Sequence, residues 1–371
     1  MSEKLRLGVV FGGRSGEYEV SIMSAKSILA VLDAQKYEVT QIGIDHDGAW
    51  WSGVEVLHSF EIGNTTSLYR VAIMPEPGRT ILYRRNPKGE SEELSILTSL
   101  DAIFPVVHGT FGEDGTLQGL FELADIAYVG AGVLGSSVGM DKGLFKDVMR
   151  ANQIPVVDWI ICTRKEINTK IDAIIEKAEE MAAYPLFVKP SNLGSSVGIS
   201  KCKNRSDLMG GILDAARYDR RILIEQGLNA REIEISVLGN EIAQVSIPGE
   251  IRPSDEFYSY RAKYIDGKSE LLIPAPLSPE ITKQVQEIAL QVYQAIDCAG
   301  MARIDFLLDK DTNKLFVNEV NTIPGFTSIS MYPKLWEASG LSYRQLINQL
   351  IELALDRKQE RDKCERSYSR N

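Results

Sequence analysis

RIDFLLDKDTNKLFVNEVNTIPGFTSISM, residues 303–331, is the stretch that decides the fold of this chain. Two short runs of strand-forming residues, RIDFLL and LFVNEVN, flank the turn-forming triplet DTN. Polar and apolar residues alternate in the first run, which is typical of a half-buried strand. The stretch therefore predicts a β-hairpin with a tight turn.

The register of this hairpin places polar side chains on one face. If the loop centres on Thr312, Asp305 lies opposite Glu319, and Arg303 lies opposite Asn321. Two carboxylates directly opposite each other repel, unless their face is solvated or a cation lies between them. Because carboxylate and amide oxygens are ligands that Mg²⁺ prefers, this face is a candidate metal site.

A surface hairpin with a hydrated face is the alternative, and it is the commoner explanation of an isolated pattern of this kind. Two neighbouring features favour the metal site. The turn at residues 324–325, Pro-Gly, directs backbone N–H groups towards the same face. The other face of the hairpin is expected to be apolar, with Ile304, Phe306, Phe316 and Val320. A metal acting together with phosphate is the working hypothesis.

Length and charge limit the classes of protein. The chain has 371 residues, 44% of them hydrophobic, and a formal net charge of −10. This length predicts two or three domains. The negative charge argues against nucleic acid or an anionic membrane as partner, since phosphate backbones are bound by basic faces. A bound phosphate group would need a local cluster of lysines.

The cysteines and histidines indicate no structural metal site. Four cysteines are scattered without CxxC spacing, and the three histidines do not pair with them as zinc ligands. No secretory signal precedes the first strand, and no apolar run approaches the length of a membrane span. We therefore expect a reduced, cytoplasmic protein without a membrane partner.

The N-terminal part predicts a β-turn-α-β unit, with a strand at 5–11, a glycine turn at 12–16, a helix at 20–32 and a strand at 37–44. The glycines lack the GxGxxG spacing of dinucleotide-binding loops, so that interpretation is weak. Glu17, at the helix entrance, either complements the helix dipole or binds a substrate ammonium group.

A further strand, residues 102–107, ends at His108, and a glycine-rich loop containing Glu113 follows. Ligands bind at the carboxyl ends of parallel strands in α/β sheets, so both residues are candidates for a site. Their alternative role is capping and turn formation. Residues 52–97 predict additional strands with a turn at 86–89 and indicate no chemistry.

A composition change announces a second domain, with the apolar strand 186–190 ending near Lys189. Burying an unpaired ammonium group is costly, so Lys189 is predicted to meet an anion such as phosphate. The Ser/Gly-rich loop 191–198 either closes over a nucleotide or is an ordinary flexible hairpin. Residues 135–142, GSSVGMDK, look like a phosphate loop without the GxxxxGK[ST] pattern, and Lys142 is also compatible with a surface position.

The chain then enters a third domain through strands at 222–226 and 231–238. Glu232 and Glu234 alternate in the second of these strands. We expect the base and the ribose of a nucleotide at this crossing.

A long connection, residues 249–276, follows these strands and is rich in Tyr, Lys, Asp and Pro. Long loops inside compact domains are either disordered or functional lids, and Lys263 and Tyr264 lie in the middle of this one. Ser278 is expected to cap the next helix, and Ser342 the last helix, which we expect to end near residue 357.

Eight motifs in series resemble those of the D-alanine:D-alanine ligases of the ATP-grasp superfamily. They are GGRSGEYEVS, HGTFGEDGTLQG, MDK, VKPSNLGSSVG, IEQGLNAREIE, AKY, RIDF and NEVNTIPGFTSISMYP. Each motif alone is weakly specific, but their order over residues 5 to about 357 makes the resemblance highly specific. Some members carry Lys where this chain has Gln226, so no cation is implied beside the adenine.

The resemblance implies an α/β, three-domain ATP-grasp fold with an N-terminal Rossmann-like (pre-ATP-grasp) domain. The expected domains are residues 1–130, a central ATP-grasp subdomain at 131–225, and a C-terminal ATP-grasp subdomain at 226–371 that contains the lid and the metal site. ATP would lie between the second and third domains, and two D-alanine sites would face the first.

The resemblance also implies a role for each matching residue. The residues expected to bind ATP hold either its phosphates (Lys142, Lys189 and Lys263) or its adenine and ribose (Glu225, Leu228 and Glu232). The expected metal ligands are Asp305, Glu319 and Asn321. The residues expected at the first D-alanine are Glu17, which would bind its ammonium group, Ser195, Tyr264 and His108. The expected oxyanion site is Arg303 with the Gly325 N–H, and the expected second-substrate pocket is Ser330 with Met331.

The implied activity is an ATP-dependent ligation of two D-alanines through an acyl phosphate, for peptidoglycan precursor synthesis. It implies two Mg²⁺ ions, with Mn²⁺ as a substitute, a cytoplasmic location and a homodimer. Rivals are a ligase joining D-alanine to D-lactate or D-serine, which Tyr264 and Met331 disfavour, and a non-catalytic nucleotide-binding module.

Overall fold

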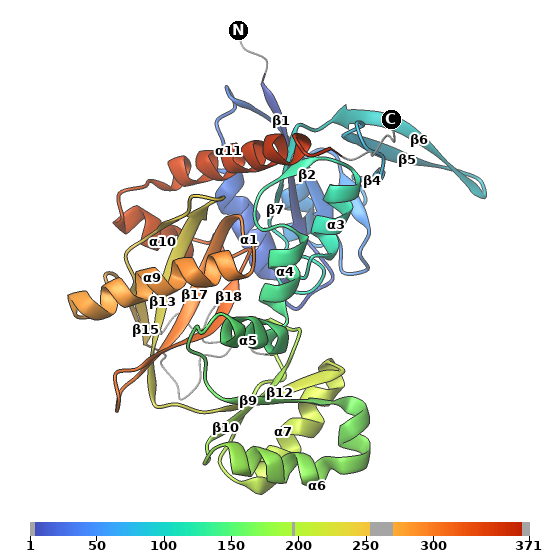
Figure 1. Cartoon of the computed structure of the whole chain (residues 1–371). Helices are drawn as coiled ribbons and strands as arrows, with labels where there is room; N and C mark the ends of the chain where they lie inside the picture. The colour runs from blue at the N-terminus through green and yellow to red at the C-terminus, as the bar shows by residue number, and fades with distance from the viewer. Residues whose placement is uncertain (1–3, 195–196, 253–269, 366–371) are drawn as a thin grey trace, which may run out of the picture.

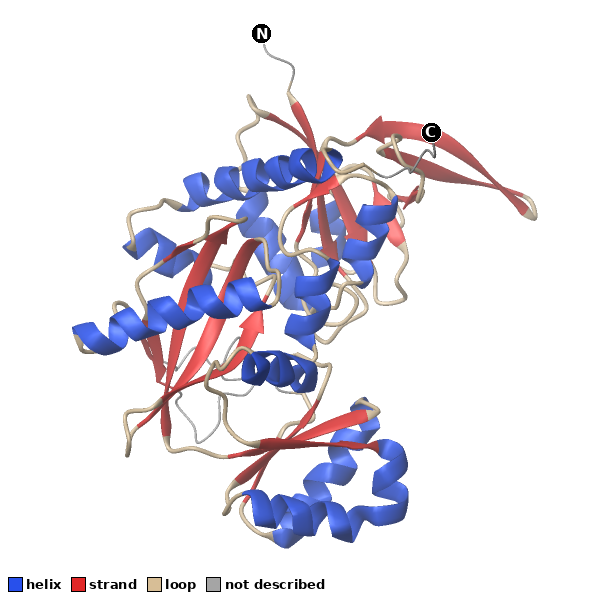
Figure 2. Ribbon diagram, in the orientation of Figure 1, coloured by secondary structure: helices blue, strands red, loops and turns tan. Residues whose placement is uncertain are grey.

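The computed structural model describes residues 4–194, 197–252 and 270–365. It contains three β-sheets with helices packed against them, as Figures 1 and 2 show. The predicted α/β class is confirmed, and the sheets follow one another along the chain. None of the described helices has both the length and the apolar composition needed to cross a bilayer.

The first sheet has eight strands in the order β6-β5-β4-β3-β2-β1-β7-β8. Its strands are β1 (Leu5–Gly12), β2 (Tyr37–Ile44), β3 (Trp50–Ser52), β4 (Tyr69–Ile73), β5 (Ile81–Lys88), β6 (Ser91–Ser99), β7 (Ala102–Pro105) and β8 (Ala127–Tyr128). Its helices are α1 (Tyr18–Leu29), α2 (Val56–Glu61) and α3 (Thr116–Leu123). Strand β1 pairs in parallel with β2 and β7, which confirms the predicted β-turn-α-β opening. The hairpin β5–β6 projects from the body of the molecule (Figure 1).

The second sheet is antiparallel and has the order β11-β10-β12-β9. Its strands are β9 (Trp159–Thr163), β10 (Leu186–Pro190), β11 (Ser200–Cys202) and β12 (Arg221–Gln226). Helices α6 (Arg164–Met181) and α7 (Arg205–Tyr218) cover one face of it (Figure 2). Both strands were predicted, and the structure pairs β12 with β10, so that Glu225 lies opposite Phe187.

The third sheet has the order β16-β15-β13-β17-β18, and β14 pairs with β13. Its strands are β13 (Ala230–Gly239), β14 (Gln244–Val245), β15 (Gly249–Arg252), β16 (Glu270–Leu272), β17 (Gly300–Asp309) and β18 (Leu315–Asn321). The remaining helices are α4 (Val133–Met140), α5 (Lys142–Ala151), α9 (Pro279–Ala295), α10 (Met331–Ala338) and α11 (Tyr343–Asp362). Ser278 caps α9, with Pro279 at its first position, as expected.

Two sequence interpretations need correction. The phosphate-loop-like stretch 135–142 is not a loop, because it lies in α4 and the start of α5. The connection 249–276 begins and ends in paired strands, since β15 and β16 form an antiparallel ladder from Glu250 to Arg252. Lys263 and Tyr264, in the middle of this connection, lie outside the described residues, as does Ser195.

The hydrophobic clusters cross the predicted domain boundaries. Phe145 and Met149 of α5 pack with α9 and the third sheet, although they precede the second sheet in the chain. Leu350 and Ile351 of α11 share a cluster with β1 and β7, so the C-terminal helix completes the core of the first sheet. The division at 130 and 225 stays a prediction.

The last helix continues beyond its expected end near residue 357. Its final turns carry cations that meet acids and carbonyls next to β8. Arg357 donates to the carbonyl oxygens of Tyr128 and Gly130, and Lys358 lies 3.3 Å from Asp125. These contacts stabilise the additional turns.

Shortening Leu350 to alanine tests whether α11 belongs to the core of the first sheet. Leu350 has no exposed surface, and removing a buried leucine side chain typically costs about 2–5 kcal/mol. We expect Leu350→Ala to lower the thermal unfolding midpoint by several degrees. Leu213→Ala on α7, where the side chain is exposed, is the control. Equal midpoints for the two variants would contradict the packing of α11.

Candidate active site

One cavity of about 890 Å³ lies where the three sheets meet. This volume is in the range of sites that bind small molecules or cofactors. Every site residue predicted from the sequence that falls within the described residues lines it. They are Glu17, His108, Lys142, Lys189, Glu225, Leu228, Glu232, Arg303, Asp305, Glu319, Asn321, Gly325, Ser330 and Met331. Ser195, Lys263 and Tyr264 lie outside the described part of the chain.

The hairpin β17–β18 has the predicted register at the cavity. Asp305 pairs with Glu319, and Arg303 pairs with Asn321. Nearer the turn, however, Phe306 pairs with Val317 instead of Asn318, so a β-bulge separates the two halves of the ladder. A ladder without the bulge would place Asn318 opposite Asp305. The extra residue therefore brings Glu319 to the metal-site face.

The bulge also changes which residues fill the core. Phe316 was expected on the apolar face, but it is only half-buried. Leu315 and Val317 are buried there instead, together with Val320. Because side chains alternate along a strand, Phe316 shares the face of Leu307, the residue with which it pairs. That part of the prediction was wrong.

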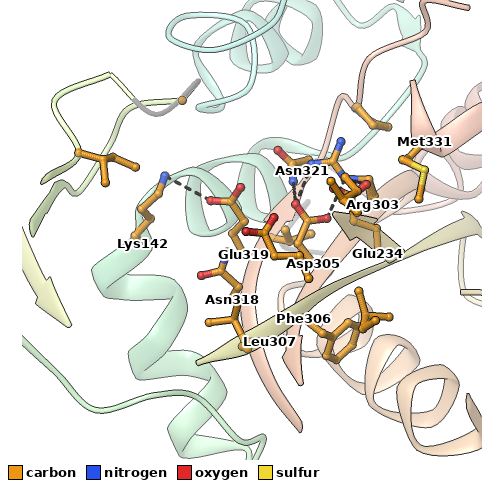
Figure 3. Close-up of a pocket in the computed structure, with 18 of the residues that line it drawn as sticks. Lys142, Glu234, Arg303, Asp305, Phe306, Leu307, Asn318, Glu319, Asn321 and Met331 are labelled. Carbon is orange, nitrogen blue, oxygen red and sulfur yellow. Dashed lines mark hydrogen bonds and ion pairs between the residues drawn. The ribbon is translucent and has the colours of Figure 1, made fainter. Parts of the chain in front are cut away.

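Arg303 neutralises the acids at the base of the hairpin. Its Nε and Nη2 atoms each donate to Asp305 over 2.7 Å, and its Nε lies 2.9 Å from Glu234 Oε2. Asn321 donates to Asp305 over 3.0 Å (Figure 3). The sequence argument allowed either a solvated face or a cation beside the facing carboxylates. In the structure the protein itself supplies a cation, because Arg303 binds Asp305.

Glu234 is a site residue that the sequence prediction missed. It is buried on β13, directly opposite Asp305 of β17. Glu232 and Glu234 alternate with apolar residues, so the strand pattern already placed both acids on one face. The pattern was noted in the sequence, but the partner strand was not known.

Lys142 lies at the start of α5 beside the second acid of the hairpin. Its Nζ donates to the carbonyl oxygen of Leu193 over 2.8 Å and lies 3.8 Å from Glu319. Asp141 caps the helix and accepts from Ser191 over 2.8 Å. These bonds hold the Ser/Gly-rich loop next to α5, and the surface position considered for Lys142 is excluded.

Two lysines meet Glu225 at the back of the cavity. Lys189 forms an ion pair with Glu225, and Lys146 Nζ lies 3.1 Å from its other oxygen. Burial raises the pKa of a carboxyl group, but these two ammonium groups outweigh it and hold the pKa of Glu225 at about 2. Burial opposes the charge on Lys189, yet Glu225 keeps its pKa above the ordinary value.

Lys146 was not predicted. It is only 1% exposed, and burial lowers its pKa while Glu225 opposes the shift. The sequence places it on α5 four residues after Lys142, one turn along the helix. Nothing else in the sequence distinguishes it from a surface lysine, because its acidic partner lies on a strand about eighty residues later.

Glu17 and Glu113 bring two acids to the edge of the first sheet. Glu17 precedes α1, and its carboxylate lies so close to Gly194 that a Cβ there would be 2.7 Å from Oε1. Glu113 accepts from Gly109 N–H over 2.6 Å and from Ile323 N–H over 3.0 Å. Burial, followed by the charge of Glu17, raises the pKa of Glu113 to about 8.

His108 is buried beside them. Its Nδ1 lies 2.9 Å from the Ile323 carbonyl oxygen and its Nε2 3.1 Å from Ser24 Oγ. Burial lowers its pKa, so the ring is neutral. The sequence left open whether His108 and Glu113 belong to a site or stabilise a turn. They line the cavity and also bind backbone groups.

The remaining predicted residues line the cavity from different elements. Leu228 lies in the turn between β12 and β13, and Glu232 lies on β13 of the third sheet. Ser330 precedes α10 and accepts from Thr327 N–H over 3.0 Å. Met331 is buried against Ile251 and Leu335.

The donor set fits a magnesium site completed by phosphate. Mg²⁺ is usually bound by one or two carboxylates together with substrate phosphates and water. Asp305, Glu319 and Asn321 supply two carboxylates and an amide on one face. The described residues contain no group of three or more His, Cys, Asp or Glu side chains suited to hold a metal by themselves. The chemistry of the site therefore suits Mg²⁺ brought in with a nucleotide.

Comparison with known proteins places the whole chain in one family. The family models "D-ala D-ala ligase N-terminus" and "D-ala D-ala ligase C-terminus" match residues 6–131 and 148–352. The D-alanine–D-alanine ligase of Natranaerobius thermophilus is 48% identical over 368 residues, 99% of each chain. That of Thermoanaerobacter sp. strain X514 is 51% identical over 355 residues, 95% of this chain and 97% of that protein.

Solved structures agree with these matches. The D-alanine–D-alanine ligase of Coxiella burnetii superposes with a TM-score of 0.81 at 40% identity, covering 98% of this chain and 97% of that chain. The VanG D-Ala:D-Ser ligase of Enterococcus faecalis gives a TM-score of 0.84 at 33% identity, covering 95% and 100%. The chain belongs to the D-alanine–D-alanine ligase family and has its ATP-grasp fold.

Proposed function

We propose that this chain uses ATP to join two D-alanines into D-alanyl-D-alanine for peptidoglycan synthesis. The observation that carries the proposal is the single cavity that brings together lysines, the acidic hairpin and the Pro-Gly turn. Such a cavity suits phosphoryl transfer, in which catalysis is mainly positioning and charge neutralisation. The full-length relatives at 46–51% identity support the substrate.

ATP would lie between the second and third sheets. We assign its adenine and ribose to Glu225, Leu228 and Glu232, and its phosphates to Lys142, Lys189 and Lys263. Lys189 and Lys142 already meet anionic or carbonyl oxygens of the protein. Phosphate binding therefore requires both lysines to exchange partners. The free energy of binding would be the difference between the free energies of the two sets of contacts.

Asp305, Glu319 and Asn321 would hold the metal, for which we propose two Mg²⁺ ions. When bound, Mg²⁺ would neutralise charge on the transferring phosphoryl group. Arg303 orients the Asp305 carboxylate at the cavity through two hydrogen bonds.

The first D-alanine would lie near Glu17, whose carboxylate would bind its ammonium group. Its carboxylate oxygen attacks the γ-phosphorus, the bond to the bridging β,γ-oxygen breaks, and ADP leaves. The product is an acyl phosphate. The cavity wall would exclude water from it, together with the proposed lid at residues 249–276.

The second D-alanine would then attack through its neutral amine. A bond forms between nitrogen and the carbonyl carbon, the nitrogen loses a proton, and phosphate leaves with the oxygen that joined it to the acyl group. The Gly325 N–H and Arg303 would stabilise the oxyanion. We place Ser195, Tyr264 and His108 around the first D-alanine.

Ser330 and Met331 would form the pocket of the second substrate. A ligase for D-serine or D-lactate shares the ATP site, so only this pocket and the lid separate the alternatives. The buried, apolar surroundings of Met331 favour the methyl group of D-alanine over a hydroxymethyl group. We further propose the domains 1–130, 131–225 and 226–371, a homodimer and a cytoplasmic location.

The direct test of the function is phosphate release from Mg-ATP with D-alanine, D-serine or D-lactate as acceptor. We expect one phosphate for each D-alanyl-D-alanine and no release without an amino acid. The dipeptide should be the main product when the acceptors compete at neutral pH. A depsipeptide as main product would overturn the substrate assignment, and ATP binding without any turnover would favour the non-catalytic module.

Replacing one acid of the hairpin separates the metal site from a structural hairpin. We expect Glu319→Gln to reduce ligation at least about 100-fold, because a proposed ligand of Mg²⁺ is lost, and with it the positive charge that would stabilise the transferring phosphoryl group. Its thermal midpoint without Mg²⁺ should stay near that of the unmodified chain, since Glu319 is part-exposed and Lys142 keeps its bond to Leu193.

The control for this experiment is Glu337→Gln on the exposed side of α10, which should keep full activity. A Glu319→Gln protein that is clearly less stable but still active would identify a structural hairpin.

A further inference from the structure

The turn that contains Gly325 is held by the first part of the chain. Ile323 and Phe326 flank Pro324-Gly325, and both are buried. The N–H of Ile323 donates to Glu113 and its carbonyl oxygen faces His108. The N–H of Phe326 donates to Ser24 Oγ over 3.1 Å. The backbone on each side of Gly325 thus contacts side chains from the loop between β7 and α3 and from α1.

The partners of His108 and Ser24 determine which group donates and which accepts in each hydrogen bond of this network. A carbonyl oxygen only accepts, so Nδ1 of His108 carries a proton and donates to Ile323. The ring is neutral, and its Nε2 therefore accepts. Ser24 is the donor to Nε2, over 3.1 Å, while its oxygen accepts from Phe326 N–H. Ser24 uses its hydroxyl as donor and as acceptor at once.

A side chain at Gly325 would require Ser330 to move. A Cβ at this position would lie 2.8 Å from Ser330 Oγ. Tyr343 donates to the carbonyl oxygen of Phe326 over 3.0 Å, and the Phe326 ring packs edge-on against Phe104 and Tyr332. Tyr343 thus holds the carbonyl oxygen of Phe326, and Ser24 holds its N–H.

We infer that Ser24 is a positioning residue for the second half of the reaction: it links His108 to Phe326 N–H and so aims the Gly325 N–H at the oxyanion. The inference rests on the proposed function, which assigns the oxyanion to Gly325. Ser24 lines no part of the cavity and acts through the backbone. Phosphoryl transfer to the first D-alanine takes place before the oxyanion forms, so it does not depend on this aim.

The test compares two buried serines of the same helix. Ser21 and Ser24 both have no exposed surface. Ser21 accepts from Gly12 N–H over 2.7 Å and donates to the Val106 carbonyl oxygen over 2.5 Å, all within the first part of the chain. Ser21→Ala therefore loses two similar hydrogen bonds without touching the Gly325 turn, and it is the matched control.

The measurement is the first turnover of full-length enzyme with Mg-ATP and D-alanine, with ADP and dipeptide quantified in the same quenched samples. A displaced catalytic group commonly costs one to two orders of magnitude, so we expect Ser24→Ala to slow dipeptide formation about tenfold. ADP formation should stay within about twofold, because His108 keeps its bond to the Ile323 carbonyl oxygen and so stays in place beside the first D-alanine. In Ser21→Ala, ADP and dipeptide should form at equal rates, even if this variant is less stable.

The contrary outcomes are distinct. If both products slow equally in Ser24→Ala, or if neither slows, the positioning role is wrong. If Ser24→Ala does not fold, Ser24→Cys, whose thiol is a weaker donor and acceptor, must show the same separation in smaller degree, and its absence overturns the inference. If the unmodified enzyme makes ADP but no dipeptide, the proposed function fails instead.

Discussion

The pairing of Arg303 with Asp305 and Glu234 is the interaction on which the site depends. The three residues come from β13 and β17, which are neighbours in the third sheet, and Glu319 and Asn321 extend the same face onto β18. A buried charge without a partner costs several kcal/mol, so the acids can line a cavity only because a guanidinium lies between them. The opposite face of these strands packs on α9. The sheet thus presents one polar face and one apolar face.

The same rule governs the cations. Lys189 and Lys146 meet Glu225, and Lys142 meets Leu193 O and Glu319. A chain with a net charge of −10 binds a polyphosphate only where lysines are concentrated. Because these lysines already have partners, the proposed binding of nucleotide phosphates would exchange one set of ion pairs for another. This exchange would limit the affinity for wrong anions.

The sequence predicted the elements and much of the site, for physical reasons that differ by residue. The alternation of polar and apolar residues along 303–321 was sufficient to predict which residues of the hairpin face each other, because successive side chains of a strand point to opposite faces. It could not reveal the bulge at Asn318, and Phe316 was therefore misplaced. The phosphate-loop-like stretch became helix α4, since glycine and serine spacing alone does not determine backbone conformation. Lys146 and Ser24 were not predicted as site residues, because the groups that they contact are distant in sequence.

The central claim is that the cavity transfers phosphate to the carboxylate of D-alanine before the peptide bond forms. The most direct measurement uses D-alanine with both carboxyl oxygens replaced by ¹⁸O and follows the label into inorganic phosphate by mass spectrometry. The account predicts one ¹⁸O atom in the phosphate released for each dipeptide, because the oxygen that joins the acyl group to phosphorus leaves with it. Dipeptide formed with unlabelled phosphate would contradict an acyl phosphate and with it the role assigned to this site.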